Sequence, residues 1–185
     1  RYYYPLPLSL VFKFNAEFGY VFGGGVEGVP VSERFFPGGI YSVRGFEPRG
    51  LGPTIDTLGV GDPVSSSGEF TLGGNKQAIF NLEIEFPILE AAGIKGVIFA
   101  DGGNAFNDDE GLFYIGPPKD MQPDAYVMRS GNKLKPPLGL YYSFGFGFRW
   151  FSPIGPLRFE WGIPITKRAE DDRGLIFEFT IGNLF

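Results

Sequence analysis

Two short motifs in this 185-residue sequence contain the residue types of ligand-binding sites. Gly23-x-Gly25-x-x-Gly28 matches a dinucleotide-binding pattern, but Pro30 follows where that pattern requires a helix. The acidic stretch 101–110 (DGGNAFNDDE) offers oxygen ligands for calcium, but it lacks EF-hand spacing and is expected to be a solvated loop. The chain has no His and no Cys, which excludes His-dependent triads and thiolate or imidazole metal sites. We therefore expect no metal, no cofactor and no enzymatic activity.

Charge and composition narrow the class of protein further. Lys and Arg number 16 against 21 Asp and Glu, and this net charge of −5 argues against a nucleic-acid partner, which would require a basic patch. Aromatic residues make up 17% of the chain, unlike a disordered protein, and 29 Gly with 16 Pro indicate many turns. The mean hydropathy is +0.00, and no run approaches the roughly 18 apolar residues of a membrane helix. An all-β protein fits these values, and a membrane β-barrel is compatible with them.

Alternation of apolar and polar residues predicts the elements that position the charged groups. From 8 to 22 the even positions are apolar and mostly aromatic, whereas the odd positions are mixed and polar. The same pattern predicts strands at 78–86, 138–150, 157–165 and 175–185, a shorter strand at 94–101, and the end of another at 1–5. The polar faces of these strands carry charges of both signs, at Glu83, Glu85, Arg149, Arg158 and Glu160.

Two architectures fit this pattern: a soluble sandwich with apolar faces packed inward, or a membrane barrel with apolar faces toward lipid. The stretches 8–22 and 138–150 exceed the typical soluble strand of about 5–6 residues and suit a tilted membrane span of about 9–11 or more. Aromatic residues lie near strand ends, where membrane barrels have interface girdles: Tyr20, Phe22, Trp150, Phe151 and Phe185. We therefore predict an all-β, antiparallel transmembrane β-barrel, either the C-terminal half of a larger barrel or a small barrel of about eight strands.

The connections between the predicted strands alternate in length. The short ones are 5–7, 87–93 and 152–156, and the longer ones are 23–75, 102–137 and 166–174. Membrane barrels have short periplasmic turns and longer extracellular loops, so Phe185 is expected on the periplasmic side. We interpret 1–185 as a single barrel region, with 23–75 and 102–137 as long extracellular or lumenal loops.

The most informative segment is RFFPGGIYSVRGF (34–46), which contains Val43, Arg44, Gly45 and Phe46. This segment resembles the lead-in and the sixth-loop signature of the BamA-like superfamily of outer-membrane assembly and translocation barrels. Further blocks agree in order: GGNKQAIFNLEIEFPI (73–88), VIFADGGNAF (97–106), FRWFSPIGPLRFEWGIPI (148–165) and FEFTIGNLF (177–185). The resemblance covers essentially the whole chain and implies the C-terminal part of the barrel, without the N-terminal strands and the periplasmic POTRA domains.

The resemblance implies a role for Arg44. In the family, the loop folds back into the lumen and its arginine meets acidic residues of the inner wall, which by alignment are Glu85 and Asp101. Glu85 also lies on the polar face of its predicted strand, and Asp101 lies at the end of the next. An arginine carried into a confined lumen needs an anionic partner, because an unpaired buried charge is costly. The alternative is that Arg44 is a solvated loop residue.

The last predicted strand resembles the terminal β-signal of outer-membrane proteins. The signal is a terminal aromatic preceded by alternating hydrophobic residues, here Phe177, Phe179, Ile181 and Phe185. Asn183 departs from the apolar residue usual at its position. An ordinary final strand would fit the same residues.

The function implied by the resemblance is the folding and insertion of other barrel proteins in the Gram-negative outer membrane. The family acts without covalent chemistry at a seam between the first and last strands, where an unpaired edge templates an incoming strand. The implied partners are outer-membrane lipids, nascent β-barrel proteins, and assembly-complex lipoproteins bound through the absent POTRA domains. The alternatives are a two-partner secretion or autotransporter-assembly barrel, and a passive pore or structural anchor barrel.

Closure of the barrel is left open by the sequence. Six strands are clear and one or two more are possible, whereas small membrane barrels begin at about eight. A second copy, short strands within the long loop, or the missing N-terminal strands would complete the wall.

Overall fold

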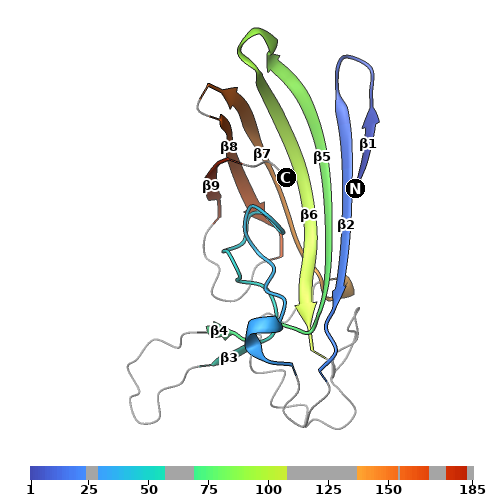
Figure 1. The fold of residues 1–185 in the computed structure, drawn as a ribbon, viewed down its shortest axis with the longest axis vertical. Helices are drawn as coiled ribbons and strands as arrows, with labels where there is room; N and C mark the ends of the chain where they lie inside the picture. The colour runs from blue at the N-terminus through green and yellow to red at the C-terminus, as the bar shows by residue number, and fades with distance from the viewer. Residues whose placement is uncertain (24–28, 57–68, 108–136, 154, 167–173, 183–185) are drawn as a thin grey trace.

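The protein forms one curved antiparallel sheet with a loop on its inner side (Figure 1). The computed structural model describes residues 1–23, 29–56, 69–107, 137–153, 155–166 and 174–182. The strands of this sheet, in spatial order, are β1 (Tyr2–Pro5), β2 (Val11–Tyr20), β5 (Lys76–Leu89), β6 (Ile94–Phe106), β7 (Tyr141–Ser152), β8 (Gly155–Pro164) and β9 (Ile176–Ile181). Each strand pairs with its neighbours in antiparallel register, which confirms the predicted all-β antiparallel class.

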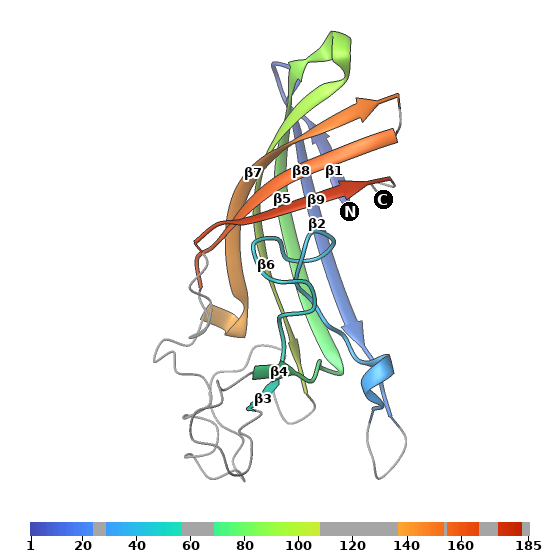
Figure 2. The same ribbon diagram turned by 90° about the vertical axis from the view of Figure 1, so that its left-hand side faces the viewer.

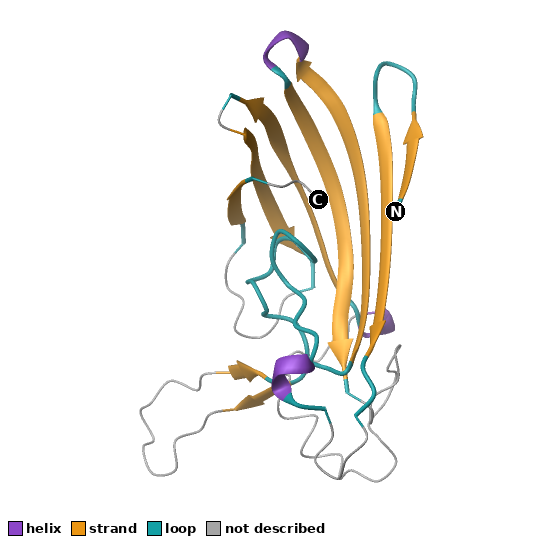
Figure 3. Ribbon diagram, in the orientation of Figure 1, coloured by secondary structure: helices purple, strands orange, loops and turns teal. Residues whose placement is uncertain are grey.

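Short elements outside this sheet lie in the connections. β3 (Thr54–Asp56) and β4 (Glu69–Thr71) pair with each other in a separate sheet, so they do not lengthen the wall. The short 3-10 helices are η1 (Val31–Glu33), η2 (Glu90–Ala92) and η3 (Pro137–Gly139), drawn in purple in Figure 3. No helix in the described part of the chain is long and apolar enough to cross a bilayer.

The two faces of the sheet differ as the alternation predicts. The apolar side chains of the outer face are exposed, for example Phe14, Phe18, Leu82, Ile98, Phe144, Phe146, Phe177, Phe179 and Ile181. The opposite, inner face carries buried charged and polar side chains, for example Glu85, Asp101, Ser143, Arg149, Arg158 and Glu160. A soluble sandwich would bury the apolar face and expose the charged one, so this arrangement contradicts the sandwich.

Aromatic rows on the outer face run across neighbouring strands. Phe148, Phe159 and Phe179 occupy paired positions on β7, β8 and β9. The ring centroids of Phe148 and Phe159 are 4.6 Å apart, and those of Phe159 and Phe179 are 4.8 Å apart. Cross-strand aromatic pairs stabilise a sheet beyond their buried area, so these rows favour the observed register of the last three strands.

Strand boundaries differ from the predicted ones where the backbone turns or where glycine hides the alternation. β2 begins at Val11 because Leu8 and Ser9 have φ of 64° and 59° in the β1–β2 turn. β6 continues past the predicted end at 101, and its last residue, Phe106, pairs with Lys76 of β5.

The connections sort by length to opposite ends of the sheet. The β1–β2, β5–β6 and β7–β8 turns lie at the upper end in Figure 1, and the longer connections leave the lower end. β1 and β9 are the two edges of the described sheet, and they do not pair with each other. The described wall is therefore open, and the short strands β3 and β4 do not close it.

Candidate functional site

The loop of residues 35–53, here called the docked loop, lies inside the curve of the sheet (Figures 1 and 2). Its base is fixed to the wall by a β-bridge between Phe35 and Gly74. The Phe35 N–H donates to the Gly74 carbonyl at 2.8 Å, and the Gly74 N–H donates to the Phe35 carbonyl at 3.0 Å. The bridge places the rest of the loop beside the inner face of the wall.

Glycines shape the tip of the docked loop. Gly38 and Gly39 have φ of +120° and +87°, values that residues with a side chain rarely adopt. The Gly38 N–H donates to the Ser42 hydroxyl at 2.7 Å, and the Gly39 N–H donates to the Val43 carbonyl at 3.1 Å. The PGG sequence thus turns the chain so that the residues after it face the wall.

Apolar side chains anchor the docked loop on both sides of Arg44. Val43, Phe46 and Leu51 are fully buried and pack with Ile79 of β5. Phe46 also meets Tyr141 of β7 edge to face, with ring centroids 5.8 Å apart. Burial of a Val, Leu or Phe side chain contributes about 1.5–3 kcal/mol each, so the loop does not depend on ion pairs alone.

Arg44 forms a bidentate ion pair with Asp101 of β6. Its Nε lies 2.7 Å from Asp101 Oδ2, and its Nη2 lies 2.7 Å from Oδ1. The Arg44 backbone N–H also donates to Oδ2 at 3.0 Å. Arg44 is 2% exposed and Asp101 is 3% exposed. The planar fork of a guanidinium suits this geometry, whereas a lysine would supply only a point charge.

Arg44 reaches two further carboxylates with its remaining nitrogen. Nη1 lies 2.5 Å from Glu83 Oε1 on β5 and 3.2 Å from Glu160 Oε2 on β8. The guanidinium carbon lies 3.7 Å from the ring centroid of Phe99, so the group also rests on an aromatic face. The side chain of one loop residue therefore contacts three strands of the wall.

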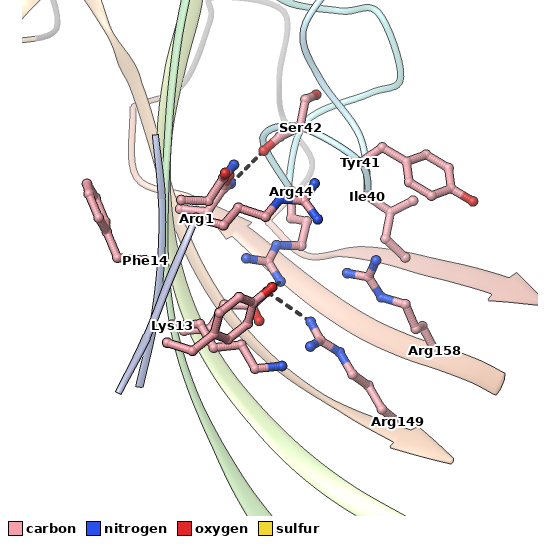
Figure 4. Close-up of a pocket in the computed structure, with 13 residues that line it drawn as sticks. Arg1, Lys13, Phe14, Ile40, Tyr41, Ser42, Arg44, Arg149 and Arg158 are labelled. Carbon is pink, nitrogen blue, oxygen red and sulfur yellow. Dashed lines mark hydrogen bonds and ion pairs between the residues drawn. The ribbon is translucent and has the colours of Figure 1, made fainter. Parts of the chain in front are cut away.

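Arg149 and Arg158 complete the charge cluster, which comprises Glu83, Asp101, Glu160, Arg44, Arg149 and Arg158. Arg149 Nη2 lies 2.9 Å from Glu83 Oε1 and 2.9 Å from Glu160 Oε1. Arg158 Nη2 lies 2.9 Å from Glu160 Oε2. Figure 4 shows both guanidinium groups pointing from the wall toward Arg44. Three positive and three negative side chains balance each other away from water, which limits the cost of burying them.

The surroundings of Arg44 stabilise the protonated form of its guanidinium. Burial alone would lower the pKa of its guanidinium, but the hydrogen bond and charge of Asp101 and the charges of Glu83 and Glu160 outweigh burial and raise this pKa above its ordinary value. Arg44 therefore remains charged in the docked loop.

Gly45 permits the close approach of the docked loop to β7 and β8. Its φ is +80°, and a Cβ there would lie 3.1 Å from the carbonyl carbon of Gly162 and 3.2 Å from Ser143 Cβ. The Ser143 hydroxyl donates a hydrogen bond to the Arg44 carbonyl. A larger residue at 45 would push the loop from the wall.

Comparison with known proteins assigns this chain to a protein family. A family model described as the Omp85 superfamily domain matches residues 1–185, the whole chain. The chain belongs to the Omp85 superfamily.

Two curated Omp85 relatives carry the name outer membrane protein assembly factor BamA. The one from Neisseria meningitidis serogroup B is 30% identical over 192 residues, which cover 99% of this chain and 23% of the relative. The one from Nitratidesulfovibrio vulgaris is 29% identical over 184 residues, which cover 99% of this chain and 19% of the relative. The chain thus spans about a fifth of the length of these relatives.

A solved structure shows the same fold. The crystal structure of BamA from Haemophilus ducreyi lacking POTRA domains 1–3 superposes with a TM-score of 0.67 at 24% identity. The match covers 96% of this chain and 32% of that chain.

The expected contact between Arg44 and Glu85 is not formed in this Omp85 chain. Glu85 instead pairs with Lys13 and with Lys95, and the acid that meets Arg44 on β5 is Glu83. The register gives the reason: Asp101 faces Asn81, and the next inner-face pair is Phe99 with Glu83. Glu85 lies one further pair along the strand, about 7 Å beyond Glu83.

Glu83 and Glu160 were both visible in the sequence as polar-face residues of predicted strands. Period-two alternation places Glu83 and Glu85 on the same face and cannot choose between them. Which of the two acids meets Arg44 depends on how far the Arg44 side chain extends along the Phe99 ring. That reach follows from the fold of the loop.

The residues of the terminal-strand signal lie on the outer face where the structure describes them. Phe177, Phe179 and Ile181 of β9 are 53%, 44% and 61% exposed. Phe185 lies outside the described residues, so its role stays a prediction.

The remaining space beside the charge cluster is small. A cavity of about 140 Å³ lies between the loop tip and the wall, lined among others by Lys13, Tyr41, Ser42, Arg149 and Arg158 (Figure 4). Small-molecule sites usually enclose about 300–1,000 Å³, so this cavity does not indicate a ligand pocket. No group of three or more acidic side chains in the described ranges is arranged to hold a metal ion.

Proposed function

We propose that this chain is the C-terminal part of the barrel wall of an outer-membrane assembly factor that folds and inserts other β-barrel proteins. The observation that carries the proposal is the docking of Arg44 on Glu83, Asp101 and Glu160, in a chain that the Omp85 domain matches from end to end. The names of the two curated relatives support the same activity.

In this proposal the docked loop acts as a brace and not as a catalyst of covalent chemistry. Arg44 joins β5, β6 and β8 from the inside, and Val43 and Phe46 exclude water beside it. A brace of this kind keeps the curvature of the wall constant while its edge exchanges partners.

The edge strand β9 supplies the site of templating. One side of β9 pairs with β8, and its other side has no strand partner among the described residues. An unpaired edge offers backbone N–H and C=O groups to an incoming strand. The nascent barrel protein is therefore the proposed substrate, bound first by main-chain hydrogen bonds.

The exposed apolar face supports a location in the outer membrane of a Gram-negative bacterium. Its aromatic and aliphatic side chains would contact lipid, and the short turns with the C-terminus would face the periplasm. Assembly-complex lipoproteins would act through POTRA domains of the longer protein.

The proposal is tested with the full-length protein in liposomes, by measuring the insertion of an unfolded outer-membrane barrel protein as the appearance of its heat-modifiable form. The wild type should accelerate insertion, and Arg44→Ala should reduce the acceleration. Arg49→Ala is the matched control, since Arg49 lies exposed in the same loop and contacts Phe36.

The same liposomes separate the alternative functions. Transport of an exported polypeptide without barrel insertion would indicate a two-partner secretion barrel. Ion conductance without either activity would indicate a passive pore. Either result contradicts the assembly proposal.

A further inference from the structure

The ion pairs of Arg44 do not explain how the docked loop is connected to β9. Those pairs reach β5, β6 and β8, and none within the described residues reaches β9. Glu178 of β9 contacts the loop: the backbone N–H groups of Ile40 and Gly45 donate hydrogen bonds to its carboxylate. One of these donors belongs to the residue after Arg44, and the other lies near the tip of the loop.

The placement of Glu178 is unfavourable for the sheet itself. It lies directly opposite Glu160 in the β8–β9 pairing, and like charges at opposed positions destabilise a sheet. Its Oε2 atom is buried and has no hydrogen-bond partner. A neutral side chain would serve the strand better, so the contact with the loop is the feature that this residue supplies.

The Glu178 carboxylate also lies beside the loop backbone at Gly39. A Cβ added to Gly39 would lie 3.4 Å from Glu178 Oε1, which is ordinary van der Waals contact. Gly45, the other glycine beside the carboxylate, is in turn in close contact with Gly162 of β8. The loop backbone therefore lies between the Glu178 carboxylate of β9 and the backbone of β8.

We propose that Glu178 is a positioning residue that couples the docked loop to the edge strand. Docking of the loop then orders β9, and ordering of β9 favours docking, since coupling between two sites is reciprocal. The coupling itself does not depend on the proposed function, but its consequence does: an assembly factor with this link would sense through the loop whether its terminal edge is engaged.

The first test measures loop docking in the full-length protein in liposomes. Trypsin cleavage after Arg44 reports undocking, because Arg44 is 2% exposed in the docked loop. Glu178→Ala leaves the N–H groups of Ile40 and Gly45 without their acceptor, and we expect this cleavage to become about tenfold faster or more. Glu178→Gln retains an acceptor oxygen and should stay within about twofold of the wild type.

The matched control is Thr180→Val, on the same face of the same strand. Thr180 Oγ1 is also buried without a hydrogen-bond partner, so Thr180→Val changes a comparable site outside the Glu178 contact. Thr180→Val should leave cleavage after Arg44 unchanged. Equal acceleration by both variants would show that any disturbance of β9 releases the loop, and would overturn the specific role of Glu178.

The second test measures coupling by hydrogen exchange of the β9 amides (Ile176–Ile181). In the wild-type background, Arg44→Ala should accelerate this exchange. In the Glu178→Ala background, the same change should add little, because the link is already absent. Additive effects of the two changes, or no effect of Arg44→Ala on β9, would overturn the coupling.

A measurement on the wild type keeps the proposal testable if Glu178→Ala does not fold. The amides of Ile40 and Gly45 must then exchange slowly, and Arg44→Ala must remove their protection together with that of β9. Fast exchange of both amides in the wild type would overturn the proposal. The assembly assay is separate, since intact coupling without insertion activity would contradict only the proposed function.

Discussion

Arg44 joins the docked loop to the wall by buried ion pairs. Arg44→Ala removes the partner of buried Asp101, and breaking a buried ion pair costs about 3–5 kcal/mol. We expect Arg44→Ala to lower the free energy of unfolding by about this amount. Arg44→Lys should lower it less, because the lysine keeps the positive charge although it loses the bidentate geometry. Urea titration of the full-length protein in detergent, followed by heat modifiability, measures both.

Double variants identify the partners. Asp101→Asn combined with Arg44→Ala should cost less than the sum of the single changes, and the same holds for Glu83→Gln. Glu85→Gln should be additive with Arg44→Ala, since Glu85 pairs with Lys13 and Lys95. Additive costs for all three acids would show that Arg44 is solvated in solution.

Gly45 is a second residue whose identity is dictated by its surroundings. Gly45→Ala combines a strained positive φ with a Cβ about 3.1 Å from Gly162, and we expect a loss of about 1–3 kcal/mol. Gly174→Ala is the control, since a Cβ there meets nothing within 4 Å. The same urea titration compares them, and equal stability of the two variants would contradict the close approach.

The sequence predicts the kind of chemistry at the site better than it predicts which residues contact each other. The absence of His and Cys excluded imidazole and thiolate chemistry, and the motif directed attention to Arg44. The Arg44–Asp101 contact follows the family alignment, whereas the same alignment indicated Glu85 where the structure has Glu83. The alternation places Glu178 on the polar face of the last strand but does not give its partners, because these are backbone N–H groups, which no side-chain pattern records.

At the scale of elements, the alternation makes a prediction about solvent. Cysteines at Phe14, Phe144 and Phe179 should resist a water-soluble thiol reagent in membranes, since these residues lie on the exposed apolar face. A cysteine at Asn15, on the opposite face of β2, should react. The chain has no native Cys, so each label reports one position.

Ser143 tests whether the loop stays docked in the membrane. It lies on the inner face but is 1% exposed and donates to the Arg44 carbonyl. Ser143→Cys should therefore resist the reagent until Arg44→Ala releases the loop. Rapid labelling of Ser143→Cys without the second change would show an undocked loop, and uniform labelling along a strand would contradict the membrane wall.

The strands themselves were predictable because period two is a local property. All seven strands of the sheet overlap their predicted ranges, including the short β1 at 1–5. The boundaries were less predictable where glycines replace larger residues, as at Gly102 and Gly103 near the end of β6. A Cβ at Gly103 would lie 2.7 Å from Val43 Cγ2. The glycine that interrupts the alternation there therefore leaves the space that the docked loop occupies.

At the scale of the whole molecule, the open wall sets a condition for folding. The sheet has edges at β1 and β9, and unpaired edges are not stable in lipid. We expect residues 1–185 expressed alone to form no monomeric heat-modifiable species, whereas the full-length protein does. Mass measurement in detergent distinguishes a monomer from a pair of copies that share their edges.

The charge cluster has a consequence for how the loop leaves the wall. Without Arg44, the charge cluster retains three carboxylates against Arg149 and Arg158, so this cluster keeps one unbalanced negative charge. Departure of the loop must then recruit a cation from the lumen, which makes undocking an ion exchange. The rate of trypsin cleavage after Arg44 should therefore rise with sodium concentration, with a slope near one in a log–log plot. Simple screening of an exposed ion pair would instead level off. In an outer-membrane barrel with this loop, the loop would therefore stay docked most firmly at low salt concentration.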